Sequence, residues 1–501
     1  MATIFDRIFR RERLKKKRMN KRSYGSFNGA QTGRLFGDLF STSNSANADI
    51  RPNLEILRNR CRALSRNNDY AKRYLNLMVT NVVGAQGIKY QSKARGNDGR
   101  LDPLNNELER LFKNWAKREY CTIAGDMTFQ DVQKLVIESL CRDGEVLVEL
   151  VNADNPYGFS IKVLEADHLD HNYNEGKPGE DNLVYAGIEF DANGKPTNYH
   201  VFKNHPYEDV TFKSKTRVRR IIPAEDLLHI YMKDRPSQVR GYPLMSSVIE
   251  RLHLLDTYEN AEVVASKIAS SKMGFFTTPQ GGDDYVGEEY EDTFTPVMNA
   301  EPGSFETLPE GYDFKAFDPQ HPTSAFESFH KQVLRGIASG LNVDYVSLAN
   351  DLTGVSYSSI RQGTMAERDH YKVLQTFMIE SFIRPVFDRW LRNLMLQDNS
   401  LFLDYTEERF DKFCESANFI PRAFHYVDPQ KEIQANINAL QNGLISMQDV
   451  QNSYGRDLEE VFDQIGREKQ LAEEKGIKTA FEPFGQKFPV DAEIQGGNDG
   501  D

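Results

Sequence analysis

The sequence predicts a mainly α-helical protein with one body that mixes helices and strands (α+β). Apolar residues recur at three- and four-residue spacing over most of the chain, which is typical of amphipathic helices. From Glu145 to Tyr231 they instead alternate, or form short runs between Gly, Asn and Asp clusters, which indicates short strands joined by turns. The 501 residues are enough for roughly three domains.

The first 48 residues are expected to form a flexible arm, because Arg and Lys crowd its first half and Gly, Ser, Asn and Thr fill the second. An electrostatic contact with nucleic acid or an acidic neighbour is the alternative. Helical spacing then begins near Asn53 and predicts helices over 54–64, 69–82, 105–117 and 129–141. Asn68 is the expected cap of the second helix, and Arg142-Asp143-Gly144 is a turn that ends the fourth.

The segment 145–231 should form a sheet of short strands, with a hairpin turn at 191–194. Leu244 to Met273 contains no Gly or Pro, so a helical rod about 45 Å long is expected there. Residues 274–322 are rich in Gly, Pro, Asp and Glu and should form a small acidic lobe. A helix over 324–341, a loop over 342–357 and a longer helix over 358–395 follow, with a kink at Pro385. Further helices are expected over 428–444, over 447–455 and up to Gly476.

The net charge is −12, from 62 Lys and Arg against 74 Asp and Glu. Affinity for phosphate comes from clustered cations that release counterions, so tight wrapping of nucleic acid is disfavoured. No run approaches 18 apolar residues, and we therefore expect no membrane span. The four cysteines, Cys61, Cys121, Cys141 and Cys414, are widely separated and should be buried thiols, with no zinc site or disulfide framework.

The common enzymatic motifs are missing, including a phosphate-binding loop, H-E-x-x-H and G-x-S-x-G. His168 and His171 lie close in sequence, but no ligand set surrounds them, so ordinary surface histidines are favoured over a metal site. Acidic pairs such as Asp283-Asp284 have no neighbour that would separate their pKa values, as acid–base catalysis requires. We therefore expect no catalytic residue, no metal and no cofactor.

Several segments, in their order and spacing over about residues 52–395, resemble lambda-type portal proteins of tailed phages. They are Arg66-Asn67-Asn68-Asp69-Tyr70-Ala71, Asn81-Val82-Val83-Gly84, Arg142-Asp143-Gly144-Glu145, Gln238-Val239-Arg240-Gly241-Tyr242-Pro243, Ala338-Ser339-Gly340-Leu341-Asn342-Val343, Tyr357-Ser358-Ser359-Ile360-Arg361 and Arg384-Pro385-Val386-Phe387. Asp428-Pro429-Gln430-Lys431-Glu432, Gly443-Leu444 and Gly455-Arg456-Asp457 are similar to the C-terminal part of portal proteins generally.

The resemblance implies a homo-oligomeric ring, usually a dodecamer, at one capsid vertex of the virion. Double-stranded DNA passes through such a ring without sequence specificity during genome packaging and ejection. The implied partners are the terminase large subunit, the major capsid and scaffold proteins, and later the head-completion adaptor, with no membrane involved. Synthesis is expected in the host cytoplasm.

The resemblance also divides the chain into named parts. These are a flexible basic arm (1–48), an α+β wing (49–243 with 396–430), a first stem helix (244–273), a clip (274–322), a second stem helix (323–341), a tunnel loop and tunnel helix (342–395), crown helices (431–480) and a disordered acidic tail (481–501).

Three sets of site residues follow from this division, each with an open alternative. The tunnel loop would bring Asn350, Asp351, Leu352, Thr353 and Gly354 near DNA, unless it is an ordinary helix connector. Lys267 and Lys272 are candidate channel cations, unless they lie between subunits or face solvent. The clip residues Asp283, Asp284, Glu288, Glu289, Glu291 and Asp292 would bind protein partners, unless they form a solvated acidic loop.

Two rival functions remain at the level of the sequence. A minor head protein or scaffold-associated capsid protein would share the setting but lack a channel. A magnesium-dependent DNA-processing enzyme would use the acidic pairs.

Overall fold

The computed structural model describes residues 44–96, 99–176, 182–208, 218–270, 274–277, 313–316, 326–397, 406–424, 429–454, 456 and 458–476. Residues 1–49 and 50–501 form two separate units. Helix α2 (Ala46–Ile50) spans the boundary, and all the elements after it belong to the second unit. The predicted arm, the acidic clip residues and the tail lie largely or wholly outside the described residues.

The described fold is mainly helical, as predicted, with the strands gathered between residues 145 and 231 apart from two short pairs. The helices of the N-terminal half are α3 (Leu54–Asn67), α4 (Asp69–Met78), the π-helical turn η3 (Val79–Val83), α5 (Leu104–Trp115), α6 (Arg118–Cys121) and α7 (Phe129–Asp143). The predicted cap is confirmed, since the Asn68 side chain accepts a hydrogen bond from the Ala71 amide at 3.0 Å.

The strands between residues 145 and 231 form two sheets where the sequence predicted one. Antiparallel β3-β2-β8 is built from β2 (Glu145–Asn152), β3 (Phe159–Leu164) and β8 (Leu227–Tyr231). Antiparallel β4-β5-β6-β7 is built from β4 (Leu183–Tyr185), β5 (Ile188–Phe190), β6 (Pro196–Phe202) and β7 (Arg219–Pro223). The predicted turn at 191–194 connects β5 to β6, and the Asp191 amide donates to the Lys195 carbonyl at 2.9 Å.

Strand β2 explains why two sheets form. Its side chains alternate between two faces, and each face carries buried apolar residues. Val146, Val148 and Leu150 join the large core, whereas Leu147 joins a smaller cluster with Ile188 and Val201 of the second sheet, among others. Apolar side chains on both faces of a strand must be covered, and residues of the second sheet cover Leu147 on the face that also carries Glu145 and Glu149.

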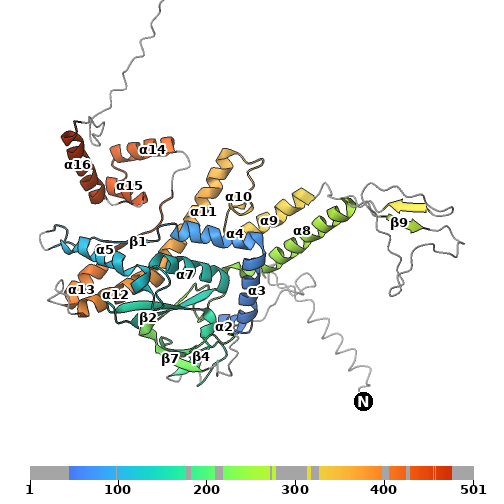
Figure 1. Cartoon of the computed structure of the whole chain (residues 1–501), viewed down its shortest axis with the longest axis horizontal. Coiled ribbons are helices and arrows are strands. Elements are labelled where there is room, and N and C mark those ends of the chain that lie inside the picture. Colours follow the sequence, from blue (N-terminus) through green and yellow to red (C-terminus); the bar gives the residue numbers. More distant parts are fainter. Residues whose placement is uncertain are drawn as a thin grey trace, which may run out of the picture. The chain divides into compact units, whose positions relative to one another are not determined.

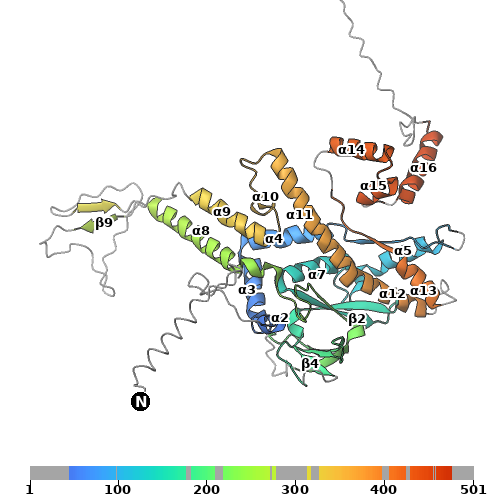
Figure 2. The same cartoon turned by 180° about the vertical axis from the view of Figure 1, so that it is seen from behind.

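The helices after Pro243 follow the predicted order. A 3-10 turn, η6 (Leu244–Val248), leads into α8 (Ile249–Ser270), and α9 (Phe326–Gly340) runs beside α8 (Figures 1 and 2). Strands β9 (Gly274–Thr277) and β10 (Asp313–Ala316) pair antiparallel between these two helices in sequence. The predicted loop 342–357 contains one short helix, α10 (Tyr345–Ala349), which is too brief to produce a periodic signal.

The long helix predicted over 358–395 is interrupted near Pro385, as expected. It consists of α11 (Tyr357–Met378), the π-helical turn η7 (Ile379–Ile383) and α12 (Arg384–Leu396), visible as one bent rod in Figure 2. Pro385 has no backbone N–H and cannot donate a hydrogen bond within the helix. Just before it, the Arg384 amide donates to the Ile379 carbonyl five residues earlier, which is the π-helical pattern.

The C-terminal part returns to the first helices. Helix α13 (Glu407–Glu415) precedes β11 (Ala417–Ile420), which pairs antiparallel with β1 (Lys89–Ser92), a pairing that the sequence did not predict. Beneath this pair, an aromatic cluster of Phe112, Trp115, Phe387 and Trp390 fills the large core. Helices α14 (Pro429–Gln441), α15 (Met447–Ser453) and α16 (Leu458–Glu474) complete the described residues.

Candidate channel and partner-binding surfaces

A buried carboxylate, Glu145, organises the polar interior beside β2. Its oxygens accept hydrogen bonds from the guanidinium groups of Arg58 and Arg240, and Nε2 of His229 lies 2.9 Å away. All four side chains are nearly inaccessible to solvent. Burial alone would raise the pKa of Glu145, but the two arginines hold it well below its usual value, so the carboxylate is ionised.

The same place joins two of the segments that carry the family resemblance. Gly144 has a φ of +86°, and a Cβ there would lie 2.1 Å from the backbone carbon of Tyr242. The Gly241 amide donates to Glu145 at 2.8 Å. The Arg142–Glu145 and Gln238–Pro243 segments therefore fit each other as backbone against backbone, which requires glycine at the contact. Their role is structural.

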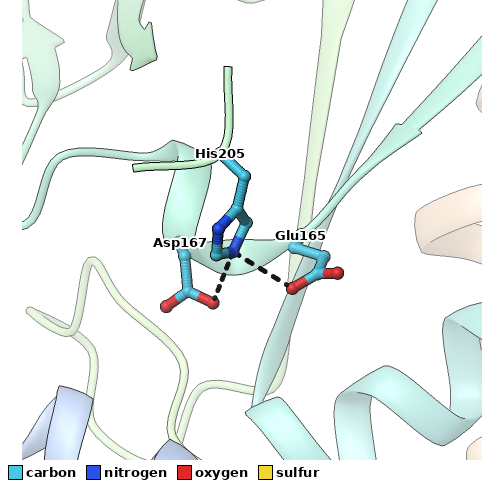
Figure 3. Close-up of side chains that lie close together, drawn as sticks. All are labelled: Glu165, Asp167 and His205. Carbon is cyan, nitrogen blue, oxygen red and sulfur yellow. Dashed lines mark ion pairs between the residues drawn. The ribbon is translucent and has the colours of Figure 1, made fainter. Parts of the chain in front are cut away.

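A second polar cluster contains Glu165, Asp167 and His205 (Figure 3). Nε2 of His205 lies 3.4 Å from Glu165 Oε2 and 3.6 Å from Asp167 Oδ2. These residue types and distances would suit a metal ion. However, Arg62 already pairs with the same oxygen atoms, at 2.5 Å from Asp167 and 3.5 Å from Glu165.

A metal ion would have to displace that guanidinium. A second guanidinium, that of Arg58, lies 3.7 Å from the other Asp167 oxygen. We therefore interpret the cluster as ion pairs that tie α3 to the segment after β3. His168 and His171, expected at the surface, are both partly buried. Burial lowers the pKa of each of these two imidazoles, which favours their neutral form.

The predicted tunnel-loop residues follow α10 and lie close to α9. Asn350 ends α10 with a φ of +54°, a conformation that asparagine tolerates, and Gly354 has a φ of +69°. Leu352, Thr353 and Gly354 are exposed. The Asp351 carboxylate turns toward the protein and binds Lys331 of α9, 3.2 Å away.

Helices α8 and α9, which were predicted to be the stem helices, present an apolar surface. On α8, Leu252 and Leu255 are buried, whereas Leu254, Val263 and Val264 are exposed. A groove of about 700 Å³ runs between α8 and α9. Its lining residues are Arg251, Leu254, Leu255, Tyr258, Phe329, Gln332 and Val333. Sequence reasoning missed this groove, because helical spacing alone does not separate a face that packs within the chain from one that stays open.

The other predicted site residues are placed only in part. Lys267 is exposed near the end of α8. Lys272 and all six acidic clip residues (Asp283, Asp284, Glu288, Glu289, Glu291 and Asp292) lie outside the described residues. None of the helices that the structure describes has the length and apolar character needed to cross a membrane.

Comparison with known proteins decides the family. The sequence profile of "Phage portal protein, lambda family" matches residues 32–375. The chain belongs to the lambda family of phage portal proteins. The probable portal protein of Halomonas phage phiHAP-1 is 33% identical over 92% of this chain and 89% of its own length. Portal protein B of Escherichia phage lambda is 21% identical over 91% of this chain and 92% of its own length.

Solved structures with some likeness include the neck of an empty GTA particle and the neck of a native GTA particle computed with C12 symmetry. Both are 14% identical and cover 79% of this chain and 93% of the matched chain, with TM-scores of 0.42 and 0.41. These scores are too low to support an argument, so the assignment depends on the sequence matches.

As a tailed-phage portal protein, the chain is a structural component of the capsid and not an enzyme. The matches give no support to a channel-free minor head protein or to a magnesium-dependent nuclease.

Proposed function

We propose that copies of this portal protein close into a ring, most simply a dodecamer, whose bore carries double-stranded DNA into and out of the capsid. The ring occupies one vertex of the virion, as the connector between head and tail, after synthesis in the host cytoplasm. Membership of the portal family supports this proposal. The open apolar surface of α8 and α9 is the structural observation that carries it.

That surface is unusual for a chain that works alone. Leu254, Val263, Val264 and Phe329 are each more than half exposed, and they lie on two neighbouring helices with a groove between them. Exposed apolar patches mark contact sites, and in a ring each subunit uses two different surfaces against its two neighbours. We infer that a second copy of the chain covers this surface.

The negative net charge of the chain favours a channel through which DNA moves over a surface that binds DNA tightly. A ring of subunits that each carry −12 has a large negative net charge, which disfavours tight binding of DNA phosphates that would stall movement. Lys267 and Lys272 remain the proposed cations that centre the duplex. The tunnel-loop residues Asn350 to Gly354 are proposed to approach it.

The remaining assignments are proposals of the same standing. Residues 49–243 and 396–430 form the wing, 244–273 and 323–341 the stem, 274–322 the clip, and 431–480 the crown. The acidic clip residues at 283–292 would bind the terminase large subunit during packaging and the head-completion adaptor afterwards. The major capsid and scaffold proteins would contact the ring as it enters the capsid.

The test replaces Phe329 with Arg in the full chain and measures particle mass by mass photometry, with negative-stain microscopy for the bore. We expect the unchanged protein to form rings and Phe329→Arg to remain as small species, because burying the new charge between subunits is costly. The matched control is Ile221→Arg, a similarly exposed apolar residue on β7. Rings of normal mass from Phe329→Arg would overturn the assignment of this surface.

A further inference from the structure

The loop after α10 is folded around one carboxylate. Asp351 Oδ1 accepts hydrogen bonds from the backbone amide of Thr353 at 2.9 Å and from its hydroxyl at 2.5 Å. Asp351 Oδ2 accepts a hydrogen bond from the Tyr345 hydroxyl at 2.9 Å. The carboxylate is therefore used within the protein, and it fixes the backbone of the two residues that follow it.

A cation from α9 completes the arrangement. Nζ of Lys331 lies 3.2 Å from Asp351 Oδ2 and donates to the Thr353 hydroxyl at 3.2 Å. Glu327, one turn earlier on α9, pairs with the same ammonium at 2.8 Å. We call Lys331, Tyr345, Asp351 and Thr353 the loop clamp. The hydrogen bonds from Thr353, followed by that from Tyr345, hold the pKa of Asp351 well below its usual value, so its charge is present at neutral pH.

The helix before the clamp is also anchored. The Ser347 hydroxyl donates to the nearly buried carboxylate of Glu367 on α11 at 2.8 Å, and Tyr371 donates to the same carboxylate at 2.7 Å. Nε of Arg73 on α4 donates to the Ser347 carbonyl at 3.0 Å. Helix α10 is thus held to α4 and α11, while the clamp joins the loop to α9.

Between these anchors, Leu352 has no comparable restraint and points outward. Its side chain is 65% exposed. The residues on either side of it, Asp351 and Thr353, are the two loop members of the clamp. The negative charge of the turn, on Asp351, therefore faces the protein, and the uncharged side chain of Leu352 is at its exposed end.

We propose that Asp351 is a positioning residue, which with Lys331 and Tyr345 fixes the loop so that Leu352 is the side chain presented to the duplex. This inference rests on the proposed function, which places the loop in the channel. An apolar tip forms no ion pair or hydrogen bond with phosphate, so contact with the backbone of DNA stays weak and independent of sequence. A loop fixed by the clamp keeps that contact at a constant position.

The first experiment tests the clamp without DNA. Hydrogen exchange of the loop amides is measured in the assembled full-length protein, unchanged and as Asp351→Ala, Lys331→Met and Lys331→Arg. We expect about tenfold faster exchange around Thr353 in Asp351→Ala, a smaller increase in Lys331→Met, and recovery in Lys331→Arg. The control is Lys372→Met, which removes an exposed ion pair with Asp369 on α11 and leaves the loop alone.

The second experiment tests what the loop contacts. A photoreactive amino acid replaces Leu352 in particles that contain DNA, and another replaces Ile221 on β7 as the control position. We expect DNA crosslinks from position 352 and none from position 221. Adding Asp351→Ala should reduce the yield from position 352 at least severalfold, because the tip is no longer held in place.

The two experiments separate the two possible failures. Loop exchange that is unchanged in Asp351→Ala, or a crosslinking yield that is indifferent to that substitution, would overturn the role given to Asp351. Absence of any crosslink from position 352 would instead overturn the placement of the loop in the channel, on which the inference rests.

Discussion

Two regions of the molecule differ in what they bury and what they expose: the interior beside β2, and the pair of helices α8 and α9. The first buries ions, with Glu145 enclosed by Arg58 and Arg240 at almost no exposure. The second leaves large apolar side chains such as Phe329 and Leu254 in solvent. Interactions within one chain complete the first region, whereas we propose that another copy of the chain covers the second. On this proposal, the two regions separate residues that maintain the subunit from residues that assemble it.

The largest expected effect comes from removing one partner of the buried carboxylate. Arg240→Met should lower the free energy of unfolding by about 3–5 kcal/mol, because Glu145 loses hydrogen bonds and a counter-charge in a place that water does not reach. Urea denaturation of the full chain measures it. Lys372→Met, which breaks an exposed pair, should cost no more than about 1 kcal/mol. Equal losses in the two variants would show that burial of the ions has no special role.

The backbone contact in the same region should be nearly as sensitive. Gly144→Ala combines a φ of +86° with a Cβ only 2.1 Å from Tyr242, and we expect a loss of roughly 3 kcal/mol. Gly194→Ala is the matched control, since its φ is +80° but no atom lies within 4 Å of the added Cβ. It should cost about 1–2 kcal/mol, the backbone strain alone. A control as damaging as Gly144→Ala would mean that the close approach is unimportant.

Acid should weaken the ion-rich region selectively. The pKa of Glu145 is lowered from 4.5, and burial lowers that of His229 from 6.5. A group whose pKa is lowered by folding stabilises the fold at pH values above its ordinary pKa. This contribution is lost as the pH falls from the ordinary pKa toward the pKa in the folded state. We expect stability to fall below about pH 6.5, and more steeply below about pH 4.5, since each tenfold difference in proton affinity between the folded and unfolded states is worth about 1.4 kcal/mol.

Denaturation curves at about pH 7, 5.5 and 4 test this dependence, because these values bracket the ordinary pKa of histidine and of glutamate. The stability of Arg240→Met should depend less on pH, because the pKa of Glu145 is lowered less without the Arg240 charge. A pH response that is the same in both proteins would contradict the assignment of the effect to this cluster.

The smallest effect on the isolated chain is expected on α9, in the proposed stem. Phe329→Ser should change the free energy of unfolding of the unassembled chain by no more than about 0.5 kcal/mol, because the side chain is already more than half exposed. The same substitution should impair ring formation. A large loss of stability before assembly would mean that Phe329 belongs to the core of the subunit, and the contrast between the two regions would disappear.

Features that depend on neighbouring residues could be predicted from the sequence. Asn68 caps a helix, residues 191–194 form a turn, and Pro385 follows a break in a long helix, each for a local reason. The pairing of β1 with β11 could not be predicted, because neither four-residue strand has a distinctive pattern and the partners are far apart.

The same limit applies to the candidate site. The resemblance pointed to the loop 350–354, but nothing in the order of residues showed that Asp351 turns away from solvent toward Lys331, about twenty positions earlier. Ion pairs between separate helices and loops depend on how those elements pack together. The spacing of apolar residues predicts the elements but not their packing. The open groove of α8 and α9 was missed for the same reason.

The pairing of β1 with β11 has a consequence for how the protein is made. Gln91 and Asn418, which meet in this pair, are 327 residues apart. During translation β1 can pair with β11 only after the ribosome has synthesised residues 417–420. The N-terminal part of the fold therefore stays incomplete for most of synthesis. The subunit is therefore completed late in synthesis, and a truncated nascent chain would lack its finished body.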